Sequence, residues 1–269
     1  MPSVTVHGVE LYYESYGRGT PILTLHGTPS SAVLYVEAAG VLAERGLCII
    51  YDRRGFNRSP APTAFDTVDM SDQVADAVGL LDHLGVDRAV LVGRSTGGQI
   101  AIAIAHQHPD RVRALVLLEP AMFSVEPRAD AFARELRTRV LAAADRDPAS
   151  VAEVVVREAL GDETWRGLPP DLRQMFVDAG PALLAEVRGR GLDLSEEPFA
   201  LADEELAKLR PPTLLVTGAD SLDACRVVNE HLARTLPRAE TAVVPGGHLI
   251  NPADPVVLDF LDRLLAPSA

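Results

Sequence analysis

Residues 90–104 read Val-Leu-Val-Gly93-Arg94-Ser95-Thr96-Gly97-Gly98-Gln-Ile-Ala-Ile-Ala-Ile. The stretch begins as an apolar run typical of a buried strand, passes through Gly-x-Ser-x-Gly, and continues as a helix-forming run. A sharp strand-to-helix turn strains the serine backbone, and the flanking glycines provide the room that the turn needs. In this context the pattern predicts that Ser95 is a nucleophile.

Short apolar runs alternate with segments of helical period along the rest of the chain. This alternation is typical of an α/β fold with a parallel sheet and crossover helices. Strands are predicted at 4–7, 11–16, 22–25, 48–51, 89–92, 114–118, 213–217 and 241–244, and helices at 33–45, 70–84, 96–108, 222–235 and 255–265. On the helix 70–84, the spacing predicts that Asp72, Asp76 and Asp82 form a solvated face without chemistry.

About 90 residues without a convincing strand separate Leu118 from Thr213, which is too long for a simple connection. Apolar residues at helical spacing predict three or four amphipathic helices there, broken at Pro148, Pro169–Pro170 and Pro181. The sequence therefore predicts a core formed by residues 1–120 and 209–269. A helical cap, residues 121–208, is inserted after the sixth strand.

The composition is that of an ordinary soluble globular protein, with 269 residues, 47% hydrophobic and 23% charged. A net charge of −13 argues against a nucleic-acid or anionic-membrane partner, because phosphate polymers bind a cationic face. No secretion signal and no apolar run near ~20 residues is found, so a cytoplasmic location is expected. Cys48 and Cys225 are expected to be unbridged. Lys208, the only lysine, lies in a polar stretch, so a Schiff-base mechanism is set aside.

A serine hydroxyl needs a base to remove its proton during attack. His248 follows the last predicted strand in the flexible turn Pro-Gly-Gly-His-Leu, which makes it the preferred base among seven histidines. His106 and His108 close the helix after Ser95, where a histidine caps carbonyl groups.

Acyl transfer also needs donors for the developing oxyanion. Leu25-His26-Gly27-Thr28-Pro29 ends a strand and opens a loop, so the backbone amides of Thr28 and Thr96 are the predicted oxyanion donors. His26 is interpreted as ordering that loop and not as transferring protons.

Four motifs carry a resemblance to the α/β-hydrolase superfamily: His-Gly-x-Pro at 26–29, Asp52-Arg53-Arg54-Gly55 with Arg58-Ser59 behind it, the turn at 93–97, and Gly-Gly-His at 246–248. Within that superfamily, the chain resembles the bacterial branch of esterases, lactonases, haloperoxidase-like and haloalkane-dehalogenase-like proteins. The resemblance implies an eight-stranded, mostly parallel sheet with helices on both faces. It also implies no metal and no organic cofactor.

The chain departs from the family pattern at two positions. Asn57 stands where a second glycine is usual, and asparagine tolerates left-handed backbone geometry, so the turn is expected to be intact. Ser95 stands where the dehalogenases and epoxide hydrolases of this branch use aspartate. Those two activities are therefore disfavoured.

The third member of the triad has two candidates. In the family the acid commonly follows the seventh strand, where this chain has Ser221 at the usual position and Asp220 one residue early. Some relatives place it directly after the sixth strand, where this chain has Glu119. Glu119 is preferred, Asp220 is the alternative, and Asp223 is more distant.

The sequence thus predicts a serine hydrolase that cleaves a small hydrophobic ester, lactone or thioester through an acyl-enzyme on Ser95. A carbon–carbon bond hydrolase or lyase with the same triad, and a ligand-binding receptor on this fold, stay open as alternatives. The expected partner is a small-molecule substrate, and a homodimer is left open. Arg94 either faces the pocket and binds a substrate anion or pairs with an acid.

Overall fold

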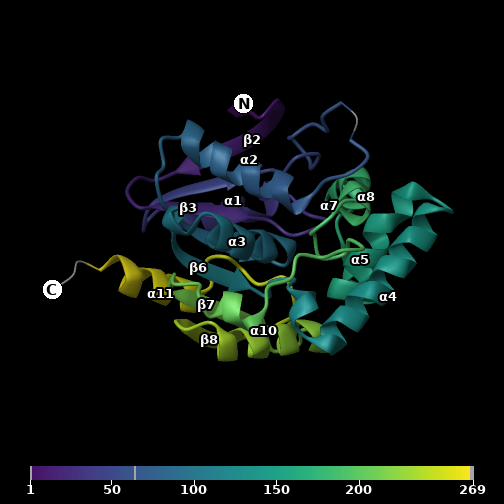
Figure 1. Cartoon of the computed structure of the whole chain (residues 1–269). Coiled ribbons are helices and arrows are strands. Elements are labelled where there is room, and N and C mark those ends of the chain that lie inside the picture. Colours follow the sequence, from purple (N-terminus) through teal and green to yellow (C-terminus); the bar gives the residue numbers. More distant parts are fainter. Residues whose placement is uncertain (1, 64, 267–269) are drawn as a thin grey trace.

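The computed structural model describes residues 2–63 and 65–266 (Figure 1). Residues 1, 64 and 267–269, which belong to the predicted core, lie outside these two ranges. Eight strands form one sheet in the order β1-β2-β4-β3-β5-β6-β7-β8, in which β1 and β2 pair antiparallel and β3 to β8 pair parallel. The strands are β1 Ser3–Val6, β2 Val9–Tyr16, β3 Pro21–Leu25, β4 Leu47–Tyr51, β5 Ala89–Arg94, β6 Val112–Leu118, β7 Thr213–Gly218 and β8 Ala239–Val244. The predicted mostly parallel sheet is confirmed.

Helices cover both faces of the sheet, as predicted. One face packs against α2 (Met70–His83), α3 (Thr96–Gln107) and α10 (Asp223–Thr235), and the other against α1 (Val36–Leu42) and α11 (Pro255–Leu265). Alternate residues of one strand enter the two cores: Leu91 lies in the first and Val90 in the second. Burial on both faces explains why the central strands are continuously apolar.

Two local predictions were wrong. The segment predicted as one helix at 33–45 divides into a 3₁₀ turn, η1 (Ala32–Tyr35), and the shorter α1. Asp76 is not on a solvated face: it is fully buried, and the Arg54 Nε and Nη2 groups donate to its two carboxylate oxygens at 2.7 Å each. Helical spacing could not show Asp76 buried, because its partner comes from the loop after β4.

The segment 121–208, named here the cap, is helical and gathers at one end of the sheet, on the right in Figure 1. Its elements are η3 Phe123–Val125, α4 Pro127–Ala144, η4 Pro148–Ser150, α5 Val151–Leu160, α6 Asp162–Gly167, α7 Pro170–Asp178, α8 Gly180–Arg188 and α9 Asp203–Leu206. The cap thus has more helices than the three or four predicted. Gly161, with φ +86°, separates α5 from α6. The predicted break at Pro181 falls just before it, at Ala179 between α7 and α8, and Pro181 itself lies in the first turn of α8, where proline is tolerated.

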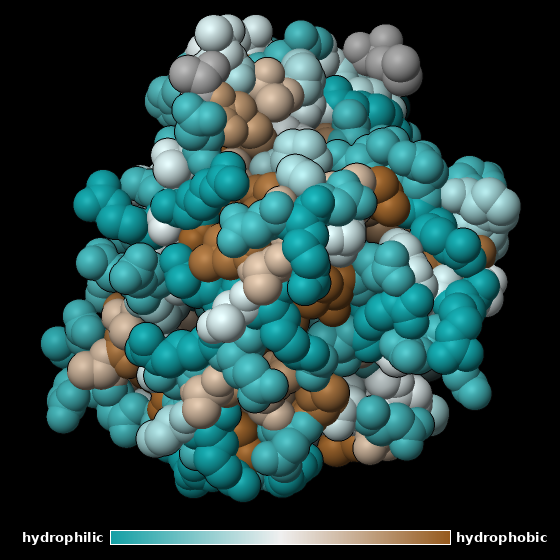
Figure 2. Space-filling view, turned by 90° about the vertical axis from the view of Figure 1, so that its right-hand side faces the viewer, coloured by the Kyte–Doolittle hydropathy of each residue, from teal (hydrophilic) through white to brown (hydrophobic). Residues whose placement is uncertain are grey.

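Figure 2 views the molecule from the cap side, and this face is mostly hydrophilic with small separate hydrophobic areas. The apolar stripes of the cap helices are therefore largely turned inward. Among residues 2–63 and 65–266, no helix is both long and apolar enough to span a membrane. Cys48 and Cys225 are buried and unbridged, as expected.

Candidate active site

Ser95 occupies the turn between β5 and α3. Its backbone has φ +55° and ψ −125°, a conformation that a residue other than glycine rarely adopts. A Cβ atom at Gly97 would overlap the Leu25 carbonyl oxygen, and one at Gly93 would overlap the Gly97 carbonyl oxygen. Only glycine at both positions lets the helix start close to the strand ends, and this close approach holds the Ser95 side chain above the sheet.

Glu119 follows β6, the strand beside β5, and also has a positive φ of +49°. Its Oε2 lies 2.6 Å from His248 Nδ1, and its Oε1 accepts a 2.8 Å hydrogen bond from the Gly218 N–H. Burial raises the pKa of Glu119, but the hydrogen bond and charge interaction with His248 outweigh burial and hold that pKa below its ordinary value. Glu119 is therefore an ionised carboxylate bound to the imidazole.

Asp220, the alternative acid, is exposed in the loop after β7. Its main-chain N–H donates to the Gly246 carbonyl oxygen at 2.9 Å. In the described parts of the chain, its carboxylate forms no hydrogen bond or ion pair with His248, which pairs with Glu119. Asp223 begins α10 and pairs with Arg226. Of the three acids considered, the structure brings Glu119 alone to the histidine.

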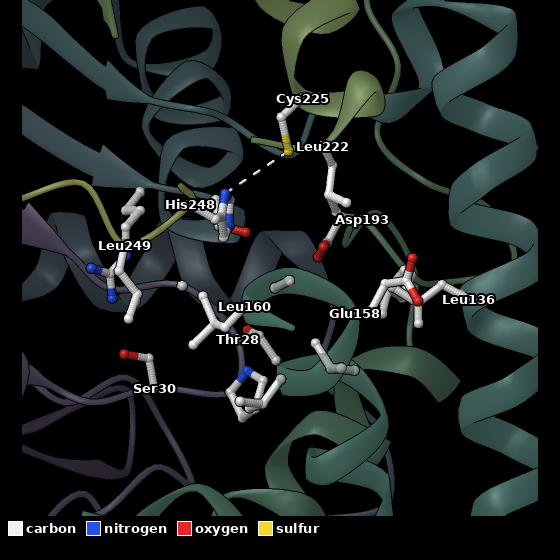
Figure 3. Close-up of a pocket in the computed structure, with 18 of the residues that line it drawn as sticks. Thr28, Ser30, Leu136, Glu158, Leu160, Asp193, Leu222, Cys225, His248 and Leu249 are labelled. Carbon is white, nitrogen blue, oxygen red and sulfur yellow. Dashed lines mark hydrogen bonds between the residues drawn. The ribbon is translucent and has the colours of Figure 1, made fainter. Parts of the chain in front are cut away.

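Cys225 is a further neighbour of this pair, with Sγ 3.9 Å from His248 Nδ1 (Figure 3). Donor atoms of Glu119, Cys225 and His248 lie within 4.8 Å of one another, close enough for a metal ion. However, His248 Nδ1 and Glu119 Oε2 lie only 2.6 Å apart and are already hydrogen-bonded to each other, which is closer than two ligands of one tetrahedral metal ion lie. Burial and the Glu119 carboxylate also raise the pKa of the Cys225 thiol. The three groups fit a hydrogen-bonded pair beside a neutral thiol better than a metal site. The sequence marked Cys225 only as an unbridged cysteine.

Ser95 and His248 line the same cavity, which has an empty volume of about 700 Å³. No hydrogen bond joins the Ser95 hydroxyl to the imidazole within residues 2–63 and 65–266. Such bonds are often long before substrate binds and tighten in the complex. The arrangement places a serine hydroxyl, a carboxylate and an imidazole after β5, β6 and β8, at the same edge of the sheet.

The loop after β3 lies directly against Ser95. A Cβ atom at Gly27 would come within 3.0 Å of Ser95 Cβ. The main-chain N–H groups of Thr28 and Thr96 donate to no other group in the described part of the chain. Thr28 lines the cavity together with Ser95, and Thr96 directly follows Ser95 in sequence, so these two free backbone donors are the candidates for an oxyanion site.

His26 holds that loop in place. Its Nε2 accepts a 3.0 Å hydrogen bond from the Arg53 N–H, and its Nδ1 lies 2.8 Å from the Gly27 carbonyl oxygen. Burial and the nearby Arg53 charge lower the pKa of His26 well below its ordinary value. An imidazole that is neutral and hydrogen-bonded at both ring nitrogens agrees with the interpretation that His26 orders the loop. Asn57 has φ +46°, so the left-handed geometry expected there is confirmed.

Glu186 of α8 connects the cap to this loop, a contact that the sequence did not predict. Its carboxylate forms a buried ion pair with Arg53. It also accepts hydrogen bonds from Thr28 Oγ1 at 2.6 Å and from Gln73 Nε2 at 2.9 Å. The sequence shows Glu186 only as an acidic residue in an otherwise apolar helix. This pattern does not indicate which residue elsewhere in the chain pairs with it.

The cap supplies most of the apolar wall of the cavity. These side chains are Phe132, Leu136, Val155, Val156, Leu160 and Phe176. Asp193 also lines the cavity and accepts a 3.1 Å hydrogen bond from Thr96 Oγ1 (Figure 3). Burial and the neighbouring Glu186 charge raise the pKa of Asp193 to about 7. Asp193 lies in an irregular segment between α8 and α9, so no periodic pattern could have marked it.

Comparison with known proteins agrees with this geometry. The family described as the alpha/beta hydrolase fold matches residues 20–255. The putative carbamate hydrolase RutD of Azorhizobium caulinodans is 30% identical over 96% of both chains. A solved structure of a thermophilic esterase from Thermogutta terrifontis is 27% identical, with a TM-score of 0.79, over 98% of this chain and 99% of that one. The structure of Est816, described as an N-acyl homoserine lactone degrading enzyme, is 27% identical, with a TM-score of 0.74, over 97% and 99%.

Other matches are shorter. Haloalkane dehalogenase 2 of Mycobacterium tuberculosis is 38% identical over 108 residues, which are 40% of this chain and 37% of that protein. The similarity to this relative is thus confined to little more than a third of its length. The esterase, the Est816 protein and the carbamate hydrolase match along nearly the whole chain, cap included.

Proposed function

The chain belongs to the α/β-hydrolase fold family and is a hydrolase; from this premise we propose that it cleaves carboxylic esters or lactones through an acyl-enzyme on Ser95. The observation that carries the proposal is the 2.6 Å contact between Glu119 and His248 beside a strained nucleophile turn. A carboxylate on Nδ1 fixes the imidazole tautomer whose Nε2 accepts a proton.

The proposed reaction has two halves. His248 Nε2 takes the Ser95 proton while Oγ attacks the substrate carbonyl carbon, and the Thr28 and Thr96 amides stabilise the oxyanion. The imidazolium, stabilised by Glu119, then protonates the leaving alcohol as the carbon–oxygen bond breaks. A water molecule, deprotonated by His248, attacks the acyl-enzyme and releases the carboxylic acid and free Ser95.

The cavity supports a small or medium-sized ester as the substrate. Its cap wall is apolar, and polar groups are concentrated near Ser95, which is typical of pockets that orient a mostly hydrophobic ligand. The esterase and the N-acyl homoserine lactone degrading enzyme that share this fold at 27% identity act on related acyl bonds by their descriptions. They support an ester or lactone bond without identifying the acyl group.

Ser95→Ala tests the proposal. The unaltered enzyme should hydrolyse p-nitrophenyl butyrate and react rapidly with a fluorophosphonate probe, and Ser95→Ala should lose both. Ser71→Ala, which changes an exposed serine at the start of α2, is the matched control and should retain both. Undiminished labelling of Ser95→Ala, or no turnover of any ester or lactone by the unaltered enzyme, would contradict the proposal.

A further inference from the structure

Arg94, the residue before the nucleophile, is a buried cation without a counter-ion. Its side chain belongs to a residue that is only 6% exposed, and it forms no ion pair and donates no hydrogen bond to any group in residues 2–63 and 65–266. Arg53 and Arg54 are also buried, and each pairs with a carboxylate, Glu186 and Asp76 respectively. Because an uncompensated buried charge is strongly unfavourable, Arg94 is unusual among the buried arginines.

Two hydroxyl groups near Arg94 are also unpartnered. Ser30 is 4% exposed and Tyr35 is 1% exposed, and neither Ser30 Oγ nor Tyr35 Oη has a hydrogen-bond partner in the described chain. The Tyr35 ring centroid lies 5.2 Å from Arg94 Cζ, so the ring supports the guanidinium from one side. Buried polar groups are normally hydrogen-bonded, so the unpartnered Ser30 hydroxyl and the unpaired Arg94 guanidinium, which line the same cavity, need an explanation.

Arg94 and Ser30 both face the substrate cavity. They line it together with Ser95 and Leu249. Arg94 and Leu249 also line a second, adjoining hollow with an empty volume of about 830 Å³. Leu249 is 47% exposed, so this side of the cavity lies near the solvent. Arg94 thus lies beside the reacting atoms and between two spaces that a substrate can occupy.

No carboxylate that lines these spaces forms an ion pair with Arg94 in the part of the chain that the structure describes. In Figure 3, Ser30 and Leu249 lie on the left of the cavity, and Asp193 and Glu158 on the right, toward the cap helices. Glu158 is paired with Arg139 at 2.6 Å. Glu37 lines the second hollow but is exposed and forms no ion pair with Arg94. Arg94, which shares the second hollow with Leu249, therefore has no carboxylate partner, while Asp193 and Glu158 lie toward the cap.

We infer that Arg94 and the Ser30 hydroxyl form a subsite for a carboxylate group carried by the substrate, close to the bond that is cleaved. The inference rests on the proposed ester hydrolysis and names the substrate class: esters or lactones that bear a carboxylate. The planar guanidinium binds a carboxylate through two parallel N–H···O bonds, and the serine hydroxyl donates a third.

Matched ester pairs test the subsite. One pair carries the charge in the acyl part, p-nitrophenyl hydrogen adipate against p-nitrophenyl adipamate. The other carries it on the leaving group, 3-(butyryloxy)benzoate against 3-(butyryloxy)benzamide. The unaltered enzyme should prefer the anionic member of at least one pair. This measurement needs no variant, so it stands even if a substitution at buried Arg94 impairs folding.

Arg94→Gln should lower kcat/KM for the preferred anionic ester by about 10- to 100-fold, the effect of losing a charge-assisted hydrogen bond, chiefly through KM. It should change kcat/KM for the neutral partner by no more than about threefold, well below the effect of losing a charged group. Arg94→Lys should restore part of the preference, and Ser30→Ala should remove a smaller part. Arg263→Gln, which removes an exposed charge on α11, is the matched control and should leave the preference unchanged.

Two results would overturn the inference. One is the absence of any preference for a carboxylate in both pairs. The other is an equal loss on the charged and neutral esters in Arg94→Gln, which would assign Arg94 to the oxyanion and not to a substrate anion. Failure of the proposed hydrolysis itself is distinguishable, because then none of the four esters is turned over and Ser95 is not labelled by the fluorophosphonate.

Discussion

Glu119 and Asp220 differ in what their carboxylates touch, so amide substitutions at the two positions should have unequal effects. Glu119→Gln leaves the shape of the site nearly unchanged but removes the charge that holds the His248 tautomer. We expect kcat for p-nitrophenyl butyrate to fall by ~10³- to 10⁴-fold, as in other serine triads. Asp220→Asn should change kcat by less than about twofold, because exposed substitutions away from a site have small effects.

The same pair of variants supplies its own control, since both remove one negative charge near the end of the sheet. Comparable small losses in the two variants would mean that neither carboxylate is the triad acid. A large loss in Asp220→Asn alone would move the acid to the loop after β7.

Asp193 should make stability depend on pH. Its folded-state pKa of about 7 lies above the ordinary value of 3.8, so the folded protein retains a proton that the unfolded chain releases earlier. Its stabilising contribution is complete below pH 4 and is lost as the pH rises to about 7. Asp193→Asn cannot ionise, so relative to the unaltered protein its Tm should be higher by roughly 2 to 6 °C at pH 8.

Differential scanning calorimetry at pH 4 and pH 8 checks this expectation. At pH 4 the side chain is protonated in the unaltered protein, and the two Tm values should agree closely. Asp178→Asn, which changes an exposed cap carboxylate at the end of α7, should show no such dependence on pH. A Tm difference that is the same at both pH values would contradict the raised pKa of Asp193.

At the level of secondary-structure elements, the contact between α8 and the loop after β3 is the most consequential. Glu186→Gln removes the charge that compensates Arg53 and weakens the hold on Thr28. Removing one partner of a buried ion pair costs about 3 to 5 kcal/mol, so the free energy of unfolding measured in urea should fall by roughly that amount. Hydrolysis should also slow, because Thr28 carries one of the proposed oxyanion amides.

Glu240→Gln breaks an exposed ion pair with Arg263 and is the control for charge removal. Exposed pairs contribute little to stability, so its urea midpoint should match that of the unaltered protein. Equal midpoints for Glu186→Gln and Glu240→Gln would show that the Arg53–Glu186 pair does not stabilise the fold.

The core elements were predictable from sequence, whereas the cap elements were less so. Each of the eight strands overlaps a predicted strand. β3 to β7 are largely buried on both faces and leave a continuous apolar signal, whereas β1, β2 and β8 are partly exposed and leave a weaker one. In the cap, helix boundaries lie at the predicted prolines Pro170 and Pro181, but Gly161 adds a further boundary between α5 and α6 that apolar spacing does not show. Periodicity reports which face of a helix is buried, but it is insensitive to where one short helix ends and the next begins.

For the site, the sequence could narrow the acid to two positions but could not decide between them. The decision depends on which loop approaches His248, and this follows from the three-dimensional path of the chain. Asp193 and Glu186 were missed for the same reason, since each acts through a partner more than 90 residues away in sequence.

At the scale of the whole molecule, the cap and the core share one cavity, so cap side chains should set the accepted acyl length. Leu136→Ala removes three carbon atoms from the cavity wall provided by α4. We expect the ratio of kcat/KM for p-nitrophenyl octanoate over butyrate to rise by about tenfold, the effect of a small change in apolar fit.

Leu258→Ala is the control for this prediction, because Leu258 of α11 packs against the core between α11 and the sheet and lines neither of the two hollows. It removes the same atoms and should leave the ratio of the two esters unchanged. An unchanged ratio in Leu136→Ala would show that the acyl chain does not extend toward α4.

The buried Arg53–Glu186 pair has a consequence for how molecules enter and leave. If the cap moved away from the core as a rigid body, the Arg53 guanidinium would stay in the protein interior without the Glu186 carboxylate, which costs several kcal/mol. Substrate and products should instead pass through the opening beside Leu249, which is already near the solvent. In this arrangement, the width of a fixed opening, more than the rate of a cap movement, determines which molecules reach Ser95.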